Sequence, residues 1–359
     1  SIGERHLRCF QATGRAELSI CERNGPLRER IARQYGVATA YADLPAALAA
    51  PHDAAVVATP AHLHLPMSAR LAEAGMHLLI EKPLATRLDG LDRLQSILAG
   101  HELKVAVAYV LRHHPALRAI REAVGGERFG RPVQLIVVSG QHFPTYRPAY
   151  REIYYADRAT GGGAVQDALT HLLNAGGWLV GRTDRLVADA AHQVLEGVNV
   201  EDTVHVVARH GDVLASYSLN QHQAPNESTI TVVCERGTCR VELHRHRWAW
   251  ITRPDGPWEE ECFAGLQRDD LFIAQARAFL DLMEGKAEPA CTLQEAADTL
   301  RTHFQVQSLE GFGAEGRHAL TGAAGGIPRL LELLEGPARQ VYAAGNLPQP
   351  NPIGLDLDA

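Results

Sequence analysis

His77-Leu78-Leu79-Ile80-Glu81-Lys82-Pro83-Leu84-Ala85 is the stretch that decides the fold of this 359-residue chain. Its apolar residues, bounded by Gly75 and Pro83, are typical of a short buried strand in a parallel sheet. Such sheets bind ligands outside the carboxyl ends of their strands, where Glu81 and Lys82 follow. The proline biases Lys82 away from helical dihedrals, so its ammonium can be held at this edge. An isolated Glu-Lys-Pro can also be a plain surface turn.

Length and composition predict a two-domain cytoplasmic protein. The chain is too long for one ordinary core, and its 46% hydrophobic and 21% charged residues are typical of globular domains. The net charge of −7 argues against a nucleic-acid or acidic-membrane partner. No apolar run is long enough to span a bilayer, and no signal peptide is apparent. The six cysteines form no Cys-x-x-Cys pair, which predicts free thiols and no metal site.

Strands alternate with helices from the beginning of the chain to about residue 108. We expect strands at 16–22, 54–59, 77–81 and 104–108, and helices from Gly3 to Gly14, after Asp43, and at 26–36, 63–75 and 89–99. This alternation predicts an α/β domain with a doubly wound parallel sheet over residues 1–108.

Beyond residue 108 the pattern changes to alternating strands joined by tight turns. We expect strands at 133–141, 186–191, 203–209, 213–219, 229–234, 238–243 and 248–253, and helices at 164–180, 269–285 and 293–309. The pattern predicts an α+β domain over residues 109–310, on a mostly antiparallel sheet with helices on one face. The last helix can pack back on the first domain. Residues 311–359, with a short helix around 329–334, form a C-terminal extension, either an arm against a neighbouring subunit or dispensable.

The first residues match the end of a dinucleotide-binding fingerprint. Gly3, after Ser1 and Ile2, opens a helix as the third glycine of Gly-x-Gly-x-x-Gly does, so we expect a strand and two glycines to precede Ser1. Glu22 lies about 20 positions further on, the spacing of the acid that binds the adenosine ribose. A carboxylate there favours NAD, whereas the adjacent Arg23 could serve the 2′-phosphate of NADP.

A second motif, Gly161-Gly162-Gly163, leads into the predicted helix with Asp167 and His171. The i, i+4 spacing puts a carboxylate and an imidazole on one helical face. Histidine can accept the proton of an alcohol during hydride transfer, and an ammonium such as Lys82 can stabilise the alkoxide. The pair could also be structural or half of a metal site, although no convincing third ligand is apparent.

Three motifs in this order resemble the Gfo/Idh/MocA oxidoreductase family. They are Thr59-Pro60-x-His62-x-His64, Glu81-Lys82-Pro83-Leu84-Ala85, and Gly-Gly-Gly-x-x-x-Asp-x-x-x-His from Gly161 to His171. The resemblance covers most of residues 1–310 and implies an N-terminal Rossmann dinucleotide-binding domain followed by an open-faced sheet. It further implies NAD(P), hydride transfer to or from a secondary alcohol or ketone of a sugar, sugar acid or cyclitol, and a homodimer or homotetramer.

Carried over residue by residue, the resemblance implies a catalytic trio of Lys82, Asp167 and His171. His171 would be the acid/base, Lys82 its electrostatic and hydrogen-bonding partner, and Asp167 the positioning group. The implied cofactor contacts are Ser1, Ile2, Gly3, Glu22, Arg23, Thr59, Pro60, His62, His64, Glu81, Lys82 and Arg112. The expected substrate contacts are Lys82, Tyr146, Arg147, Asp167 and His171.

Several of these residues also have a purely structural interpretation. Arg112 follows a strand where the family often has a loop near the active site, but it could equally begin a helix at Pro115. Tyr146 and Arg147 suit polyols and sugar acids, which bind hydroxyl and guanidinium donors, or they belong to a solvent loop. Strand alternation puts His244 and His246 on one sheet face, which favours a solvated strand over a metal or phosphate patch.

Two other functions stay open at this point. An NAD-dependent glycosidase of the same family would start an elimination by oxidation and regenerate its cofactor. A non-catalytic regulator would bind a dinucleotide or sugar while controlling a partner. Such regulators can lose the catalytic lysine or histidine, so the presence of the whole trio counts against this hypothesis.

Overall fold

The computed structural model of the protein describes residues 1–308. The predicted extension, 311–359, and its helix around 329–334 lie outside the described residues. Those that are described belong to one compact unit. None of their helices combines the length and apolar character needed to cross a bilayer.

The first part of the fold contains two small parallel sheets. β1 (Ser19–Cys21) pairs with β2 (Thr39–Tyr41), and β4 (His77–Ile80) lies between β3 (Ala54–Val57) and β5 (Val105–Val107). The helices of this part are α1 (Ile2–Gln11), α2 (Gly25–Tyr35), α3 (Leu44–Leu48), the 3₁₀ turn η1 (Ala61–Leu63), α4 (His64–Glu73) and α5 (Leu91–Gly100). The predicted alternation of strands and helices is confirmed, although β1 is shorter than expected and β2 was not predicted.

Local capping sets several of these helix boundaries. The side chain of Asn24 accepts a hydrogen bond from the Leu27 amide and so begins α2, which ends at Gly36 with a φ of 64°. Asp43 caps α3 in the same way through the Ala46 amide. Such caps satisfy amides that have no acceptor within the helix, and each contributes about 1 kcal/mol.

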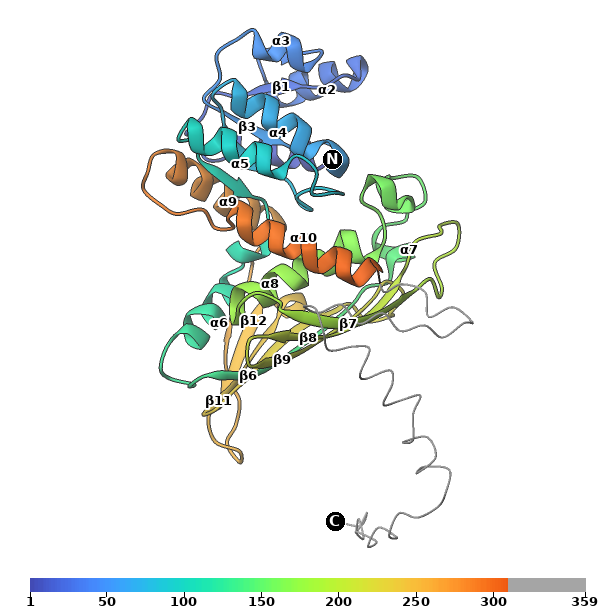
Figure 1. The fold of residues 1–359 in the computed structure, drawn as a ribbon, viewed down its shortest axis with the longest axis vertical. Helices are drawn as coiled ribbons and strands as arrows, with labels where there is room; N and C mark the ends of the chain where they lie inside the picture. Colours follow the sequence, from blue (N-terminus) through green and yellow to red (C-terminus); the bar gives the residue numbers. More distant parts are fainter. Residues whose placement is uncertain (309–359) are drawn as a thin grey trace, which may run out of the picture. The chain divides into compact units, whose positions relative to one another are not determined.

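Helices cover both faces of the β3–β4–β5 sheet. α4, α5 and the first half of α10 (Leu293–Ser308) pack on one face, and α1 and α9 (Arg268–Met283) on the other (Figure 1). Phe10 and Phe279 meet edge to face on the second side, with ring centroids 6.3 Å apart. Two helices from the far end of the described chain therefore complete the core of the first domain.

The second part is built on one eight-stranded sheet. Its strands, in spatial order, are β13 (Glu259–Cys262), β12 (Arg247–Ile251), β11 (Gly237–Glu242), β10 (Glu227–Cys234), β6 (Pro132–Gly140), β9 (Val213–Asn220), β8 (Thr203–His210) and β7 (Arg185–Ala191). All neighbours are antiparallel except β6 and β9. The mostly antiparallel sheet is thus confirmed, with β13 as an additional edge strand.

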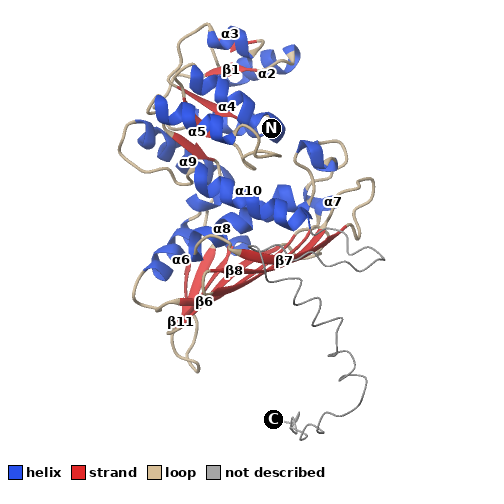
Figure 2. Cartoon of the chain, in the orientation of Figure 1, coloured by secondary structure: helices blue, strands red, loops and turns tan. Residues whose placement is uncertain are grey.

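Helices cover one face of this large sheet. α6 (Pro115–Gly125) and α8 (Thr170–Val180) lie over it (Figure 2), and both helices bury apolar side chains in the core of this domain. No helix within residues 1–308 lies over the opposite face. Val187, Val207 and Leu214 are exposed on β7, β8 and β9, and Val187 pairs with Val207 in the ladder.

The connecting segments bring two corrections. The predicted helix at 164–180 begins with a π-helical turn, η5 (Val165–Leu169), before α8. His244 belongs to the 3₁₀ turn η6 (Leu243–Arg245), and His246 follows with a φ of 50°, so the prediction of a continuous strand there was wrong. The other short elements are η2 (Val110–His113), α7 (Phe143–Tyr146), η3 (Tyr154–Ala156) and η4 (Arg158–Thr160).

Candidate active site

The Glu-Lys-Pro turn follows β4, and its Lys82–Pro83 peptide bond is cis. Glu81 is buried and accepts hydrogen bonds from His6 Nε2 at 2.6 Å and from the Lys82 amide at 2.9 Å. Burial raises the pKa of the Glu81 carboxyl, but the His6 hydrogen bond and the Lys82 charge outweigh it and hold the pKa below its usual value. Glu81 therefore fixes the backbone that carries Lys82.

His64 also contacts this turn. Its Nδ1 lies 2.9 Å from the Pro83 carbonyl and its Nε2 lies 2.8 Å from the Thr59 carbonyl. Burial lowers the pKa of His64, so the neutral ring donates to one of the two carbonyls at a time. Protein groups bond the side chains of both His64 and Glu81, and their contact with the cofactor stays a prediction.

The glycine run, Gly161 to Gly163, allows the backbone to lie close against neighbouring segments. Gly161 and Gly163 have φ values of 103° and 90°, which a residue with a Cβ rarely adopts. A Cβ on Gly163 would collide with the carboxylate of Glu201, whose Oε1 accepts a hydrogen bond from the Val165 amide at 2.9 Å. A Cβ on Gly161 would lie 3.3 Å from Ala61 Cβ in η1, so the run sits directly against the first domain.

The π-helical turn that follows presents Asp167 to Lys82. Lys82 Nζ donates to the Asp167 carbonyl at 2.8 Å and lies 3.6 Å from its carboxylate Oδ1. Arg147 approaches Oδ2 at 3.3 Å, and the Tyr154 hydroxyl donates to Oδ1 at 2.5 Å. Burial raises the pKa of the Asp167 carboxyl, but these two cations and the hydroxyl outweigh it and lower the pKa to about 2. Asp167 is therefore ionised.

His171 lies at the start of α8, beside this carboxylate. Its ring packs edge-on against Tyr109 with centroids 6.0 Å apart, and its Nδ1 is buried and makes no hydrogen bond. Burial, followed by the charge of Lys82, lowers the pKa of His171 well below its usual value. A neutral imidazole with an unoccupied nitrogen can accept a proton.

Two of the expected substrate contacts differ in their surroundings. Arg147 is bound to Asp167, whereas Tyr146 is 53% exposed. Tyr154, which the sequence analysis missed, contacts the Asp167 carboxylate directly. Tyr154 follows an irregular loop, where no periodicity or spacing could have indicated a partner.

The predicted cofactor residues of the first domain fit a dinucleotide. Ser1 caps α1 through the Glu4 amide, whereas the amides of Ile2 and Gly3 belong to the first helical turn, which has no intrahelical acceptors and favours anions such as a diphosphate. The Glu22 carboxylate follows β1 and accepts one hydrogen bond, from the Asn24 amide at 2.8 Å.

Other residues of this set lie at the ends of β1 and β3. Thr59, at the end of β3, has a buried hydroxyl with no hydrogen-bond partner, which a ligand could supply. Pro60, His62 and Arg23 are exposed. An orphaned hydroxyl, a helix N-terminus and a carboxylate beyond a strand are the donors and acceptors that a dinucleotide needs.

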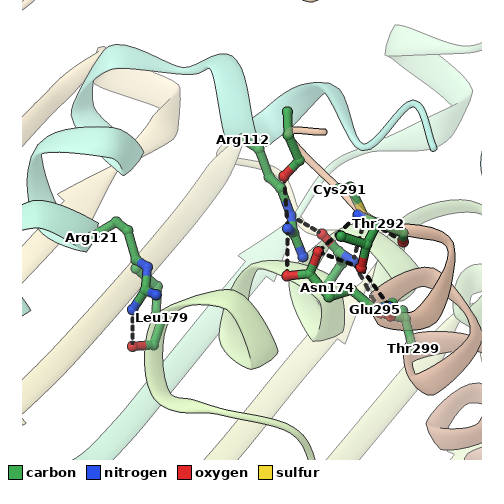
Figure 3. Close-up of polar contacts among 9 residues, drawn as sticks. Arg112, Arg121, Asn174, Leu179, Cys291, Thr292, Glu295 and Thr299 are labelled. Carbon is green, nitrogen blue, oxygen red and sulfur yellow. Dashed lines mark hydrogen bonds and ion pairs between the residues drawn. The ribbon is translucent and has the colours of Figure 1, made fainter. Parts of the chain in front are cut away.

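Arg112 has a structural role, and its contact with the cofactor stays a prediction. Its guanidinium is buried and donates to Asn174 Oδ1, the Ala290 carbonyl and Glu295 Oε1, each at 2.8 Å (Figure 3). The three acceptors come from α8, the segment before α10, and α10 itself. Arg112 therefore joins the second domain to the helices that return to the first.

Comparisons with known proteins identify the family. Residues 1–109 match the model described as the oxidoreductase family with an NAD-binding Rossmann fold, and residues 117–240 match the GFO/IDH/MocA C-terminal domain. The chain belongs to the Gfo/Idh/MocA oxidoreductase family. Its first domain is an NAD-binding Rossmann domain, and the family and fold predicted from the sequence are confirmed.

Similar proteins in this family include named sugar and cyclitol enzymes. A myo-inositol dehydrogenase of Streptomyces leeuwenhoekii is 28% identical over 312 residues, 84% of this chain and 91% of that relative. An uncharacterized oxidoreductase of Synechocystis is 27% identical over 223 residues, and the match spans 61% of this chain but only 60% of that relative. A levoglucosan dehydrogenase, solved with NADH and levoglucosan, has the same fold, with a TM-score of 0.78 at 18% identity over 86% of this chain and 94% of that one.

Proposed function

We propose that the protein is an NAD-dependent dehydrogenase that transfers hydride between nicotinamide and a secondary alcohol or ketone of a sugar, sugar acid or cyclitol. The observation that carries the proposal is the meeting of Lys82 with Asp167, beside the neutral ring of His171. Lys82 comes from the Rossmann domain, whereas Asp167 and His171 come from the second domain. The similarity to a myo-inositol dehydrogenase supports the substrate class.

Each residue of the trio has one task in the oxidation of an alcohol. Lys82 donates one N–H to the Asp167 carbonyl and retains other donors for the substrate oxygen, whose developing negative charge it stabilises. His171 accepts the hydroxyl proton on its ring as the hydride leaves the carbon. Asp167, held by Arg147 and Tyr154, stays ionised and keeps the ammonium in place.

Bound NAD would supply the hydride acceptor for this reaction. The amides of Ile2 and Gly3 would hold its diphosphate, Glu22 its adenosine ribose, and Thr59 a group near the end of β3. We assign NAD over NADP because the Glu22 carboxylate would repel a 2′-phosphate. The exposed Arg23 beside it leaves NADP as the alternative cofactor.

We further propose that the protein is a homodimer or homotetramer in which the uncovered face of the large sheet contacts a second copy. Val187, Val207 and Leu214 are exposed there on neighbouring strands, and exposed apolar patches favour protein contacts. Sedimentation of wild type and Val207→Glu tests this interface. A smaller mass for the variant supports it, whereas an unchanged oligomer excludes the face.

Titration of the full-length protein with NADH and NADPH, followed by nicotinamide fluorescence, tests the proposed function. We expect tighter binding of NADH, and weaker NADH binding in Glu22→Gln. Glu17→Gln, which removes an exposed carboxylate before β1, is the matched control and should bind as wild type does. Failure of both cofactors to bind would overturn the proposal.

A screen of sugars and polyols by absorbance then identifies the reaction. Formation of NADH from an alcohol supports the dehydrogenase. Cleavage of a glycoside without net NADH formation would instead indicate the glycosidase.

A further inference from the structure

A buried histidine of the Rossmann domain, His6, lies next to the turn that carries Lys82. It belongs to α1 and is 3% exposed, and its Nε2 lies 2.6 Å from Oε1 of Glu81, which is itself 5% exposed. The Glu81 carboxyl is ionised, because its pKa is held below the usual value, so the ring nitrogen donates this hydrogen bond. The proposed mechanism assigns no task to His6.

The Glu81 carboxylate divides its two oxygens between His6 and the catalytic residue. Oε1 accepts from the His6 ring, and Oε2 accepts from the backbone amide of Lys82 at 2.9 Å. The backbone of Glu81 is held separately, because its own amide donates to the Val57 carbonyl of β3 at 3.0 Å. The bond from His6 therefore fixes the part of Glu81 that the sheet does not hold, which is the carboxylate that reaches the Lys82 amide.

The ring of His6 has a defined position of its own. α1 begins close to the end of β3, since a Cβ on Gly3 would lie 3.7 Å from Ala58 Cβ, and His6 follows Gly3 by one helical turn. Phe272 of α9 meets the ring edge to face, with centroids 5.7 Å apart. Contacts from α9 and from the end of β4 thus fix the imidazole that donates to Glu81.

Lys82 has to be placed accurately, because its partner belongs to the other domain. Its Nζ donates to the Asp167 carbonyl at 2.8 Å and lies 3.6 Å from the carboxylate. A displacement of about 1 Å would break this hydrogen bond, and misplacements of that size can slow a reaction about a hundredfold. The flexible four-carbon stem of a lysine does not fix the ammonium by itself. The backbone from which the stem starts must therefore be held.

We infer that His6 is a positioning residue for the proposed reaction, which holds the Glu81 carboxylate against the Lys82 amide and so keeps the ammonium at the substrate oxygen. This inference rests on the proposed function. A pair that serves stability alone is the alternative, although buried ion pairs are weak sources of stability. The same helix would hold the cofactor diphosphate through the amides of Ile2 and Gly3, so α1 would align both the cofactor and Lys82.

The first measurement follows His171, because it needs no substrate. The charge of Lys82 contributes to the lowered pKa of His171, so this pKa reports where the ammonium lies. In full-length His6→Ala, NMR titration of the His171 ring should give a raised pKa, by part of the rise that removal of the charge itself produces in Lys82→Met. His6→Gln should restore the wild-type pKa, because the glutamine amide can donate to Glu81 in place of the ring.

Turnover then separates positioning from stability. With the alcohol that gives NADH in the screen, kcat of His6→Ala should fall by about tenfold to a hundredfold, while NADH affinity persists. His210→Ala is the matched control. His210 is 2% exposed and bonds the Gly181 carbonyl at 2.6 Å and the Tyr217 hydroxyl at 3.0 Å, all within the second domain. Its loss should lower stability and leave kcat and the pKa of His171 unchanged.

A double variant covers the case in which His6→Ala does not fold. Removal of His6 alone leaves the buried Glu81 carboxylate without its side-chain partner, which is costly. His6→Met combined with Glu81→Met removes both polar groups together, so no buried charge is left unpaired. The Lys82 amide still loses its acceptor, and the pKa of His171 should rise as in His6→Ala.

Three results would overturn the inference. The first is a folded His6→Ala with the wild-type pKa of His171 and wild-type kcat. The second is an equal loss of kcat in His6→Ala and His210→Ala, which would indicate a structural role. The third is a loss of turnover in His6→Ala that weaker NADH binding explains. If wild type oxidises no alcohol in the screen, the proposed function fails, whereas the pKa comparison still decides whether His6 positions Lys82.

Discussion

Two buried polar clusters join the Rossmann domain to the second domain, and they differ in how completely their groups are paired. Around Arg112, the guanidinium donates to Asn174, to Glu295 and to a backbone carbonyl. Around Lys82, the ammonium donates to one carbonyl, and His171 keeps a buried nitrogen with no hydrogen bond. Both clusters combine a cation with a carboxylate from another part of the chain.

This difference in pairing distinguishes a structural cluster from a catalytic one. Buried polar groups are normally satisfied, as those around Arg112 are, and such a cluster stabilises one arrangement of domains. Unused donors and acceptors at the Lys82 centre cost stability unless a ligand completes them. The incomplete cluster is therefore the one that we assign to substrate.

The largest expected effect is the loss of turnover in Lys82→Ala and His171→Ala. Each should lower kcat by about a thousandfold, because one removes the charge on the substrate oxygen and the other the proton acceptor. Folding and NADH binding, measured by circular dichroism and fluorescence, should persist. Lys286→Ala, at an exposed lysine, is the control. Activity within a few-fold of wild type in either variant would remove that residue from the mechanism.

Arg112→Ala should lower the stability of the fold, in contrast to the variants of Lys82 and His171, which should lower turnover. The variant leaves Asn174 Oδ1 and Glu295 Oε1 without their donor, and we expect the free energy of unfolding to fall by about 3 kcal/mol in urea denaturation. Arg121→Ala, whose guanidinium makes one longer bond of 3.4 Å to the Leu179 carbonyl (Figure 3), should lose much less. Equal losses in both variants would contradict a special role for Arg112.

The pH dependence of kcat/KM should report His171. Because the His171 pKa is lowered, the ring stays neutral, and activity should be level from about pH 8 to about pH 6.5 and fall at lower pH as the ring gains a proton. Asp167, with a pKa of about 2, contributes no limb in this range. In Lys82→Met, loss of the neighbouring charge should raise the pKa of His171, which NMR titration can measure. A fall that begins near pH 8 in wild type would contradict a neutral His171.

The smallest effect should come from Tyr154→Phe. The variant removes one hydrogen bond to the Asp167 carboxylate while Lys82 and Arg147 remain, so kcat/KM should fall by about tenfold. Tyr146→Phe, at a more exposed tyrosine, should cost less. A larger loss of kcat/KM in Tyr146→Phe than in Tyr154→Phe would indicate that Tyr146 contacts the substrate and that Tyr154 has a structural role.

The sequence predicted the parts of the site that depend on local patterns. Lys82 follows a buried strand and precedes a proline, and Asp167 and His171 follow a glycine run into a helix, so short motifs were sufficient to find all three. The alternation of strands and helices predicted the Rossmann domain, and period-two runs predicted the large sheet. Even here the π-helical turn that presents Asp167 was missed, because its extra residue has no signature in the hydrophobic pattern.

Other assignments depended on contacts between segments far apart in the chain. His64, Glu81 and Arg112 are polar residues next to motifs, which made them candidates for the cofactor. Whether a polar side chain meets a ligand or the protein depends on what packs against it. His6 bonds Glu81, Asn174 and Glu295 bond Arg112, and backbone carbonyls bond His64. Sequence spacing carries no information about such partners.

By itself, the sequence determined the family and the two kinds of sheet, because local periodicity and short motifs encode them, and the same motifs led to the proposed trio. The tertiary structure decided which cations have all their hydrogen-bond partners within the protein, as Arg112 does, and which keep free donors, as Lys82 does. Arg112 illustrates the difference, since it is one arginine among many in the sequence. It becomes a link between the domains only when the fold brings its guanidinium to Asn174 and Glu295.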